Sequence, residues 1–260
     1  MDVQMFELID TYLLRRHSRI DDNELQARRI LGETASEPVI YFLPCSTSFR
    51  MARIMGLIGD DFLACYEMPP ALTSADPNSI FAALRLLLDD AKGLIASRGI
   101  PERSVRVVGY SLGSYPACFL ANHLRTRLVS IAPADRGDLM IWESRASEML
   151  RRRARANGFD VDDFVRILRG YNPIENLQHL APESTFIFGK SDPFVPEARS
   201  SALMDAIRTS SRATGRDLRI IEVEGGHLRT LVSGARLVLG SLTTVRPTPQ
   251  CMGEPVSVAH

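Results

Sequence analysis

Residues 107–114 read VVGYSLGS, and this stretch decides how the rest of the chain is interpreted. Two β-branched residues lead into Gly109, and Gly113 follows Ser111 after one intervening residue. The pattern G-x-S-x-G between a strand and a helix is typical of a sharp turn that holds its serine exposed, and side chains at the two glycines would clash there. The same five residues also fit a plain strand–helix connection. A nucleophilic serine needs a base and an acid, which the remaining sequence must supply.

The composition is that of a globular protein with one large core. The chain has 260 residues, of which 45% are hydrophobic, and 31 basic residues balance 31 acidic ones. A net charge of zero gives no electrostatic reason to expect nucleic acid or an anionic membrane as partner. We find neither a signal-peptide pattern nor an apolar run long enough to span a membrane. We therefore expect a cytoplasmic protein, a monomer or homodimer, that acts on a small molecule.

The four cysteines do not suggest a disulfide framework or a metal site. They lack a C-x-x-C pair and a zinc-type spacing with histidine, and two of them lie in apolar runs. In addition, no G-x-G-x-x-G opens a helix after a strand, which argues against a nucleotide-binding Rossmann domain. The sequence predicts no metal and no cofactor. The cysteines are Cys45, Cys65, Cys118 and Cys251.

Short apolar runs alternate with segments of helical periodicity along most of the chain. This alternation predicts an α/β fold, a mostly parallel sheet of about six strands with helices on both faces. We expect strands within 38–44, 61–70, 104–111, 127–134, 184–190 and 217–226, and helices over 4–31, 78–98, 112–125, 197–212 and 228–242. The helix over 78–98 has a capping-type residue, Asn78, at its start.

The alternation is interrupted once, because residues 135–182 contain helical patterns and no good strand. We expect a small helical lid there, inserted into a core formed by residues 1–134 and 183–243. That core includes an N-terminal helix within residues 1–35, and residues 244–260 resemble a loose tail. Such an insertion would lie over the carboxyl edge of the sheet, where open parallel sheets bind their ligands.

His227 is the histidine best placed to serve Ser111. It follows the strand pattern 217–226 and stands directly ahead of the last helix, so its loop leaves the carboxyl edge of the sheet. The simpler interpretation is that Gly-Gly-His is only a turn. The other four histidines fall in helices, a surface segment or the tail; these are His17, His123, His179 and His260.

Two aspartates compete for the role of the acid that orients the histidine. Asp192 lies in GKSDPFVP after the strand pattern 184–190, in a loop stiffened by two prolines. Asp135 follows the strand pattern 127–134 and could reach the same histidine. We favour Asp192, because its place gives the chain order serine, acid, histidine.

With these three motifs in this order, residues 38–242 resemble the α/β-hydrolase superfamily. The resemblance implies Ser111 as nucleophile, His227 as base and Asp192 as orienting acid. It departs from the family at FLPCSTSFR, where a His-Gly pair is usual, and at the start of the sheet, where two antiparallel strands are replaced by a predicted helix. The resemblance implies that oxyanion donors come from the backbone of Leu112 and of Cys45 or Ser46.

The implied reaction is acyl transfer to water through an acyl-enzyme, with an ester or thioester of a small molecule as substrate. The same triad also serves carbon–carbon bond hydrolysis and acyl transfer to other acceptors, and fold alone does not choose among them. A different class is a small-molecule receptor that uses the scaffold without catalysis. Turnover of a p-nitrophenyl ester would separate the receptor from the enzymes.

Expectations for the substrate pocket rest on residues near Ser111 and in the predicted lid. Tyr110, Met140 and Trp142, together with Met149, could line an acyl pocket, although apolar helix residues more often belong to the core. The basic run Arg151–Arg155 is interpreted as a solvated helix face. The alternative is a grip on a substrate carboxylate or a phosphate-bearing carrier.

Overall fold

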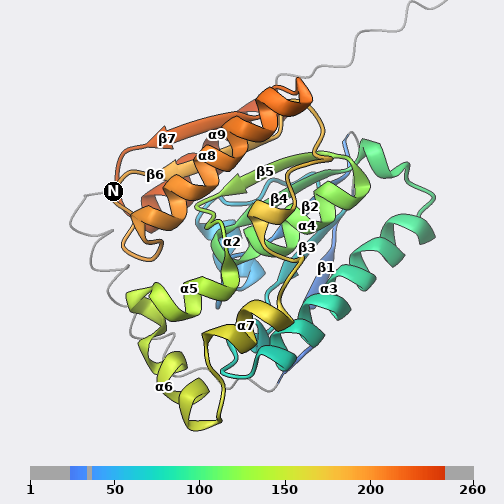
Figure 1. The fold of residues 1–260 in the computed structure, drawn as a ribbon. Helices are drawn as coiled ribbons and strands as arrows, with labels where there is room; N and C mark the ends of the chain where they lie inside the picture. Colours follow the sequence, from blue (N-terminus) through green and yellow to red (C-terminus); the bar gives the residue numbers. More distant parts are fainter. Residues whose placement is uncertain (1–23, 34–36, 244–260) are drawn as a thin grey trace, which may run out of the picture.

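The structure, a computed structural model, describes residues 24–33 and 37–243 (Figure 1). Its centre is a seven-stranded sheet in the order β1-β3-β2-β4-β5-β6-β7. Every neighbouring pair is parallel except β1 and β3. The strands are β1 (Arg28–Leu31), β2 (Val39–Phe42), β3 (Ala64–Glu67), β4 (Arg106–Tyr110), β5 (Arg127–Ile131), β6 (Thr185–Gly189) and β7 (Arg219–Val223). The predicted mostly parallel α/β sheet is confirmed, with one strand more than expected.

The extra strand corrects the prediction of an N-terminal helix over residues 4–31. Residues 28–31 form β1, which pairs antiparallel with β3, Arg28 opposite Glu67 and Leu31 opposite Ala64. Residues 1–23 lie outside the described part of the chain, as does the predicted tail 244–260. β1 is an exposed edge strand of only four residues, so its sequence lacks the continuous apolar run that marked the central strands. The antiparallel start that seemed to be missing is thus present in part.

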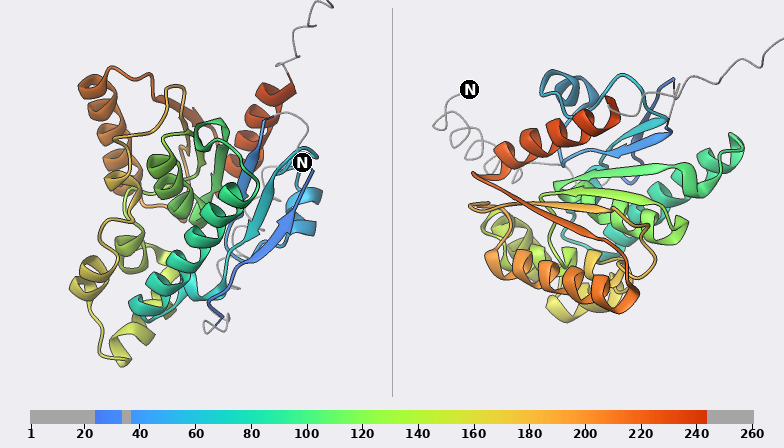
Figure 2. Two further views of the ribbon diagram at one scale, coloured as in Figure 1. Left: turned by 90° about the vertical axis from the view of Figure 1, so that its right-hand side faces the viewer. Right: turned by 90° about the horizontal axis from the view of Figure 1, so that it is seen from above.

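Strands β2 and β4 show why apolar runs in the sequence predicted the central strands. All residues of β2 and β4 are buried, because helices cover the sheet on both faces. Figure 2 shows α2 and α9 on one face and α3, α4 and α8 on the other. These helices are α2 (Phe49–Ile54), α3 (Pro77–Ser97), α4 (Ser114–Leu124), α8 (Glu197–Thr214) and α9 (His227–Thr243).

The long helix α3 illustrates how periodicity fixes packing. Its buried residues recur at helical spacing and include Ile80, Leu84, Leu87, Ala91 and Leu94. The cap is Asp76, whose carboxylate accepts a hydrogen bond from the backbone N–H of Asn78, so the predicted capping role of Asn78 is wrong. Pro77 then occupies the first turn, where the missing N–H of proline has no cost.

Every regular element that the structure describes between β5 and β6 is an α-helix or a 3₁₀ turn. These are α5 (Gly137–Glu143), a short 3₁₀ turn (Arg145–Ser147), α6 (Glu148–Ala156), α7 (Val161–Ile167) and the 3₁₀ turn η5 (Pro173–Glu175). α5, α6 and α7 lie together beside one end of the sheet, separate from the layer formed by α8 (Figure 1). None of the helices in the described ranges is both long and apolar enough to cross a membrane.

Candidate active site

Ser111 stands on a strained turn between β4 and α4. Its φ is +51°, a left-handed conformation that side chains other than glycine rarely adopt. The two flanking glycines allow this turn. A Cβ on Gly109 would lie 2.5 Å from the Cβ of Ala117, and one on Gly113 would lie 2.3 Å from the carbonyl oxygen of Phe42. The steric reason given for both glycines therefore holds in the structure.

His227 lies within hydrogen-bond distance of both predicted partners. Its Nε2 is 2.9 Å from Oγ of Ser111, and its Nδ1 is 2.7 Å from Oδ2 of Asp192. An ionised carboxylate can only accept, so Nδ1 carries the proton and Nε2 is left to accept from the Ser111 hydroxyl. His227 is the first residue of α9 and is buried, and Phe194 packs on its ring with centroids 4.6 Å apart.

Asp192 is held by the loop that follows β6. Its Oδ1 accepts hydrogen bonds from the backbone N–H groups of Phe194 and Val195, at 2.9 and 3.2 Å. This leaves Oδ2 directed at the imidazole, and only 4% of the carboxylate side chain is exposed. The acid loop, residues 190–196, thus fixes the carboxylate through its own backbone.

The alternative acid, Asp135, lies elsewhere. Its Oδ2 is 3.2 Å from Nη1 of Arg199, and no hydrogen bond joins it to His227. Burial raises the pKa of Asp135, and the nearby Arg199 guanidinium offsets part of that rise. The structure brings Asp192, not Asp135, to the imidazole.

The residues predicted to supply oxyanion donors lie around Ser111. Leu112 follows it in the first turn after β4, where backbone N–H groups lack partners within the helix. Cys45 lines the same pocket as Ser111 and Leu112, whereas Ser46 is not among the lining residues. Burial raises the pKa of the Cys45 thiol to about 11, so the thiol is neutral at pH 7.

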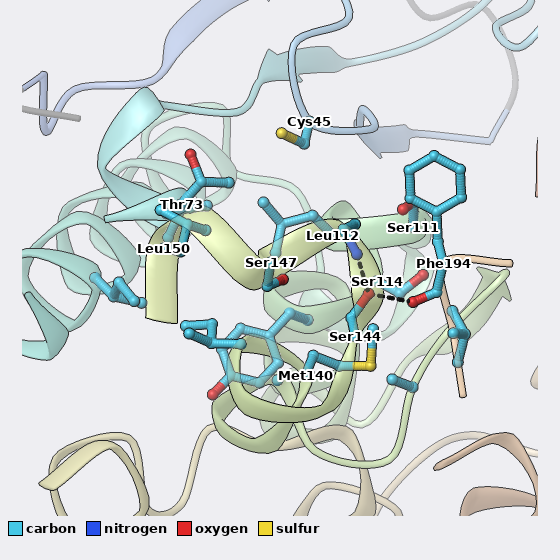
Figure 3. Close-up of a pocket in the computed structure, with 18 of the residues that line it drawn as sticks. Cys45, Thr73, Ser111, Leu112, Ser114, Met140, Ser144, Ser147, Leu150 and Phe194 are labelled. Atoms are coloured by element: carbon cyan, nitrogen blue, oxygen red, sulfur yellow. Dashed lines mark hydrogen bonds between the residues drawn. The ribbon is translucent and has the colours of Figure 1, made fainter. Parts of the chain in front are cut away.

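A pocket of about 150 Å³ opens beside Ser111. In Figure 3 Ser111 and Phe194 lie at one side of it, and Thr73 and Leu150 lie at the other. Its walls come from the serine turn, from the acid loop, from the segment before α3 and from α5 and α6. They include Leu72, Ile80, Leu112, Tyr115, Met140, Ile141, Leu168 and Val195.

Of the four residues expected to contact substrate, only Met140 lines this pocket. Tyr110 is completely buried on the opposite face of the sheet, and its hydroxyl donates to the carbonyl oxygen of Leu57. Trp142 instead packs edge-on against Phe164, with centroids 5.5 Å apart. The expectations for Tyr110 and Trp142 are wrong, and Met149 is exposed outside the pocket.

The basic run Arg151–Arg155 has mostly structural partners. Arg151 donates to the carbonyl oxygens of Ile141 and Ser144, and Arg152 pairs with Glu148. Arg155 lies over the ring of Trp142. None of these arginines is among the described residues that line the pocket.

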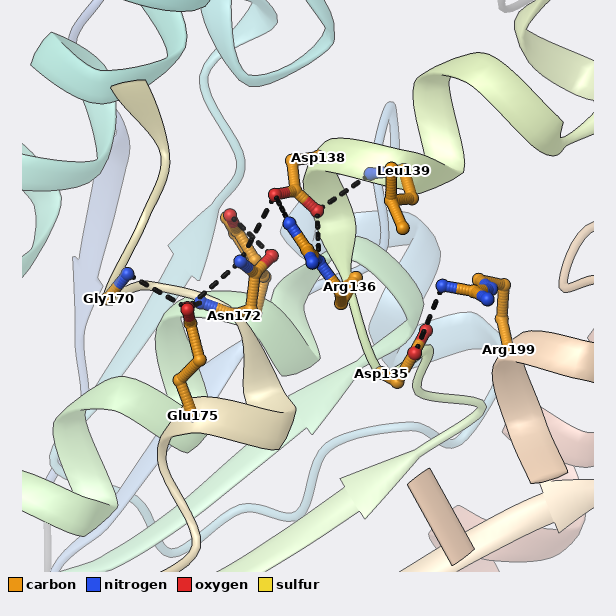
Figure 4. A network of polar contacts seen from close by, with 9 residues as sticks. Asp135, Arg136, Asp138, Leu139, Gly170, Asn172, Glu175 and Arg199 are labelled. Atoms are coloured by element: carbon orange, nitrogen blue, oxygen red, sulfur yellow. Dashed lines mark hydrogen bonds and ion pairs between the residues drawn. The ribbon is translucent and has the colours of Figure 1, made fainter. Parts of the chain in front are cut away.

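A buried polar network fixes the start of α5 (Figure 4). Asp138 is fully buried and accepts from Arg136, with the Nη2–Oδ2 distance 2.5 Å, and from the backbone N–H of Leu139. Asn172 donates to Asp138 and to Glu175, and its Oδ1 accepts from Tyr115 in the pocket wall. Sequence reasoning missed this network, because Asp138 and Asn172 lie 34 positions apart in the chain and no motif joins them.

The remaining described histidines have no part in the site. His123 and His179 are both exposed, and His17 and His260 lie outside the described residues. Within the described ranges, no group of three or more His, Cys, Asp or Glu side chains could hold a metal ion.

Comparisons with known proteins identify the fold. No protein-family profile matches the sequence, and no curated protein matches it. Solved structures do match. TT1662 from Thermus thermophilus shares 19% identity at a TM-score of 0.56, over 86% of this chain and 97% of that one. The hydrolase olei00960 from Oleispira antarctica shares 11% identity at 0.52, over 83% of this chain and 94% of that one.

A third match is the acylaminoacyl peptidase of Pyrococcus horikoshii, at 13% identity and a TM-score of 0.57. It aligns with 84% of this chain, which spans only 38% of the peptidase's length. Together with the sheet order and the serine turn after β4, these likenesses show that the chain has the α/β-hydrolase fold. At such low sequence identities, these likenesses show the fold and nothing further about this chain.

Proposed function

We propose that the protein is a serine hydrolase that cleaves a small-molecule ester or thioester. One observation carries the proposal: the hydrogen-bonded chain from Ser111 through His227 to Asp192, with Ser111 on a strained turn at the mouth of a pocket. A receptor would have no need for all three groups in this geometry. The structural neighbours described as hydrolase and peptidase support the same class.

His227 acts as the general base in this mechanism. Its Nε2 takes the proton of Ser111 as Oγ attacks the acyl carbon, and the resulting imidazolium is stabilised by the Asp192 carboxylate. The imidazolium then returns its proton to the leaving alcohol or thiol. Water, activated by the same His227, releases the acid from the acyl-enzyme in the second half of the reaction.

The oxyanion is stabilised by backbone N–H groups. Leu112 offers one donor from the first turn after Ser111, and Cys45 offers the second, since it lines the pocket with Ser111 and Ser46 does not. The partial positive charge at the start of the helical segment that follows Ser111 adds to this stabilisation. The neutral Cys45 thiol leaves Ser111 as the nucleophile.

A panel of p-nitrophenyl esters and acyl thioesters tests the proposal. The wild type should turn over at least one of them, and Ser111→Ala should lose about 10³-fold or more of that activity. Ser104→Ala, an exposed serine beyond the other end of β4, is the matched control and should retain wild-type rates. Wild-type inactivity on the whole panel, or an active Ser111→Ala variant, would contradict the proposal.

A further inference from the structure

The pocket beside Ser111 is electrically neutral. Among the described residues, those that line it include no Asp, Glu, Lys, Arg or His. Burial raises the pKa of the lining thiol, Cys45, to about 11, and therefore it also stays uncharged at pH 7. A charged substrate group inside the pocket would lose its hydration and find no counter-ion.

Most of the hydroxyl groups that line the pocket already donate a hydrogen bond to another atom of the protein. Each hydroxyl has a single hydrogen to donate. Thr73 donates to Pro70 O at 2.9 Å, Ser114 to Gly109 O at 3.0 Å and Ser144 to Phe194 O at 2.8 Å. The hydroxyl of Tyr115 donates to Asn172 Oδ1 at 3.3 Å. Apart from Ser111, the described lining hydroxyls leave only Ser147 to donate to a ligand, so the wall behaves as apolar towards an acceptor group.

The size of the pocket limits what fits between Ser111 and its far side. An apolar cavity of about 150 Å³, the volume found here, accommodates a benzene ring, that is roughly six carbon atoms. The far side is formed by Leu150 of α6 and Thr73, which lie across the pocket from Ser111 (Figure 3). A chain much longer than this would have to displace α6 or leave the pocket.

We propose that this pocket binds an uncharged acyl group of about six carbons, with Leu150 setting the length limit. This inference rests on the proposed function, since it treats Ser111 as the nucleophile that receives the acyl group. The thioether of Met140 and the ring of Phe194 provide adaptable apolar contacts along the chain. The substrate is thus an ester or thioester of a short to medium-length fatty acid.

The test compares kcat/KM for p-nitrophenyl acetate, hexanoate and decanoate, and for the mono-p-nitrophenyl ester of adipic acid. Adipate matches hexanoate in length and replaces the terminal methyl group by a carboxylate. Each buried methylene contributes a factor of about four, so hexanoate should exceed acetate at least tenfold. Hexanoate should also exceed decanoate, and should exceed adipate by about a hundredfold.

A pair of variants on α6 tests the role of Leu150. Leu150→Trp should lower the hexanoate-to-acetate ratio of kcat/KM about tenfold, because the larger side chain shortens the pocket. Met149→Trp, at the exposed neighbouring position outside the pocket, should leave that ratio unchanged. Equal ratios in the two variants would overturn the assignment of Leu150.

The outcomes separate the inference from the proposed function. Turnover of adipate as fast as hexanoate, or rates that keep rising to decanoate, overturns the inference and leaves the serine hydrolase intact. Absence of turnover with every ester and thioester overturns the proposed function. The pocket is then still testable on Ser111→Ala by thermal shift: p-nitrophenyl hexanoate should raise Tm more than the adipate ester does, and the reverse order overturns the inference.

Discussion

The position of Ser111 depends on the glycines at 109 and 113, because a side chain at either position would clash with its neighbours. Gly113 lets the turn pack against the end of β2, where a Cβ would approach the carbonyl oxygens of Phe42 and Leu43 at 2.3 and 2.6 Å. Both contacts are with backbone, which cannot move aside without shifting the sheet. The strained φ of Ser111 is therefore held by its surroundings and not by its own preference.

Gly113→Ala should destabilise the protein by about 1–3 kcal/mol, since the new methyl group overpacks a backbone contact. Gly93→Ala is the control: Gly93 lies within α3 with open space around its Cα, so alanine there should stabilise by up to about 1 kcal/mol. Urea unfolding monitored by circular dichroism measures both changes. A Gly113→Ala variant as stable as the wild type would contradict the steric account.

The two residues flanking this turn show what a sequence can reveal at residue scale. Gly113 was predictable because its constraint is local and the G-x-S-x-G spacing expresses it. The error at Tyr110 arose because adjacency to Ser111 was taken as proximity to substrate. Tyr110 shares a strand face with Val108, and side chains along a strand alternate. Because alternate residues of a strand face the same side of the sheet, this pattern predicts that the side chain of Tyr110 lies in the core behind the sheet.

Helix α5 is held by hydrogen bonds at both ends. The side of α5 that lines the pocket is therefore fixed in place. At its start, buried Asp138 is held by Arg136 and Asn172. Just after its end, the Ser144 hydroxyl donates to Phe194 O, in the residue that packs on the His227 ring. The wall of the pocket and the acid loop are therefore connected by a direct hydrogen bond.

Ser144→Ala should destabilise the protein by about 1–3 kcal/mol, because it removes the buried hydrogen bond from the Ser144 hydroxyl to the carbonyl of Phe194. It should also lower kcat on p-nitrophenyl hexanoate, because Phe194 is no longer held against His227. Ser147→Ala removes a hydroxyl of the same pocket that has no hydrogen bond among the described residues, and its stability should change by less than about 0.5 kcal/mol. Equal stabilities of the two variants would contradict the connection.

Arg136→Ala should be more costly, about 3–5 kcal/mol, since it leaves the fully buried Asp138 without its cation. The matched surface change is Arg152→Ala, which removes the exposed pair with Glu148 and should cost less than about 1 kcal/mol. Chemical unfolding of both variants gives the comparison. A small loss for Arg136→Ala would mean that the network does not anchor α5.

The helical character of residues 137–167 was readable from periodicity, but the side of α5 that faces the pocket was not. Gly137, Met140, Ile141 and Ser144 all line it, and they follow the spacing of a single helix face. Trp142 lies on another face and packs on α7 through Phe164. Choosing the pocket face requires the partners of the helix, which lie far away in the sequence.

At the scale of the whole molecule, titratable side chains are buried within the apolar core on both faces of the sheet. Tyr41, Cys65 and Cys118 are fully buried, and burial raises the pKa of each to about 12. In the unfolded chain the same groups ionise near about pH 8.5–10. At alkaline pH the folded protein thus holds protons that the unfolded chain has released.

The free energy of unfolding should fall as pH rises above about 9, because the native state then binds more protons than the unfolded state. The loss should continue towards pH 12, where these groups ionise in the folded protein as well. Urea midpoints at about pH 8 and about pH 10.5 measure the effect, and Tyr41→Phe should show a shallower decline. A midpoint that is constant over this range would contradict it.

The overall fold was predictable because most of its strands are buried on both faces and read as apolar runs. β1 was not, since an exposed four-residue edge strand leaves no such run. The assembly of Ser111, Asp192 and His227 followed from a general property of parallel sheets. Loops after β4, β6 and β7 leave the same edge, so residues 116 positions apart in the sequence become hydrogen-bonded neighbours.

The central claim, that Ser111 is a nucleophile activated by His227, is tested most directly by covalent labelling. After incubation with an alkyl fluorophosphonate, peptide mass spectrometry should locate one adduct, on the peptide that carries Ser111. Ser111→Ala should remain unlabelled, and His227→Ala should react at least about a hundredfold more slowly. An unmodified wild type, an adduct on another residue, or unchanged labelling of Ser111→Ala would contradict the account.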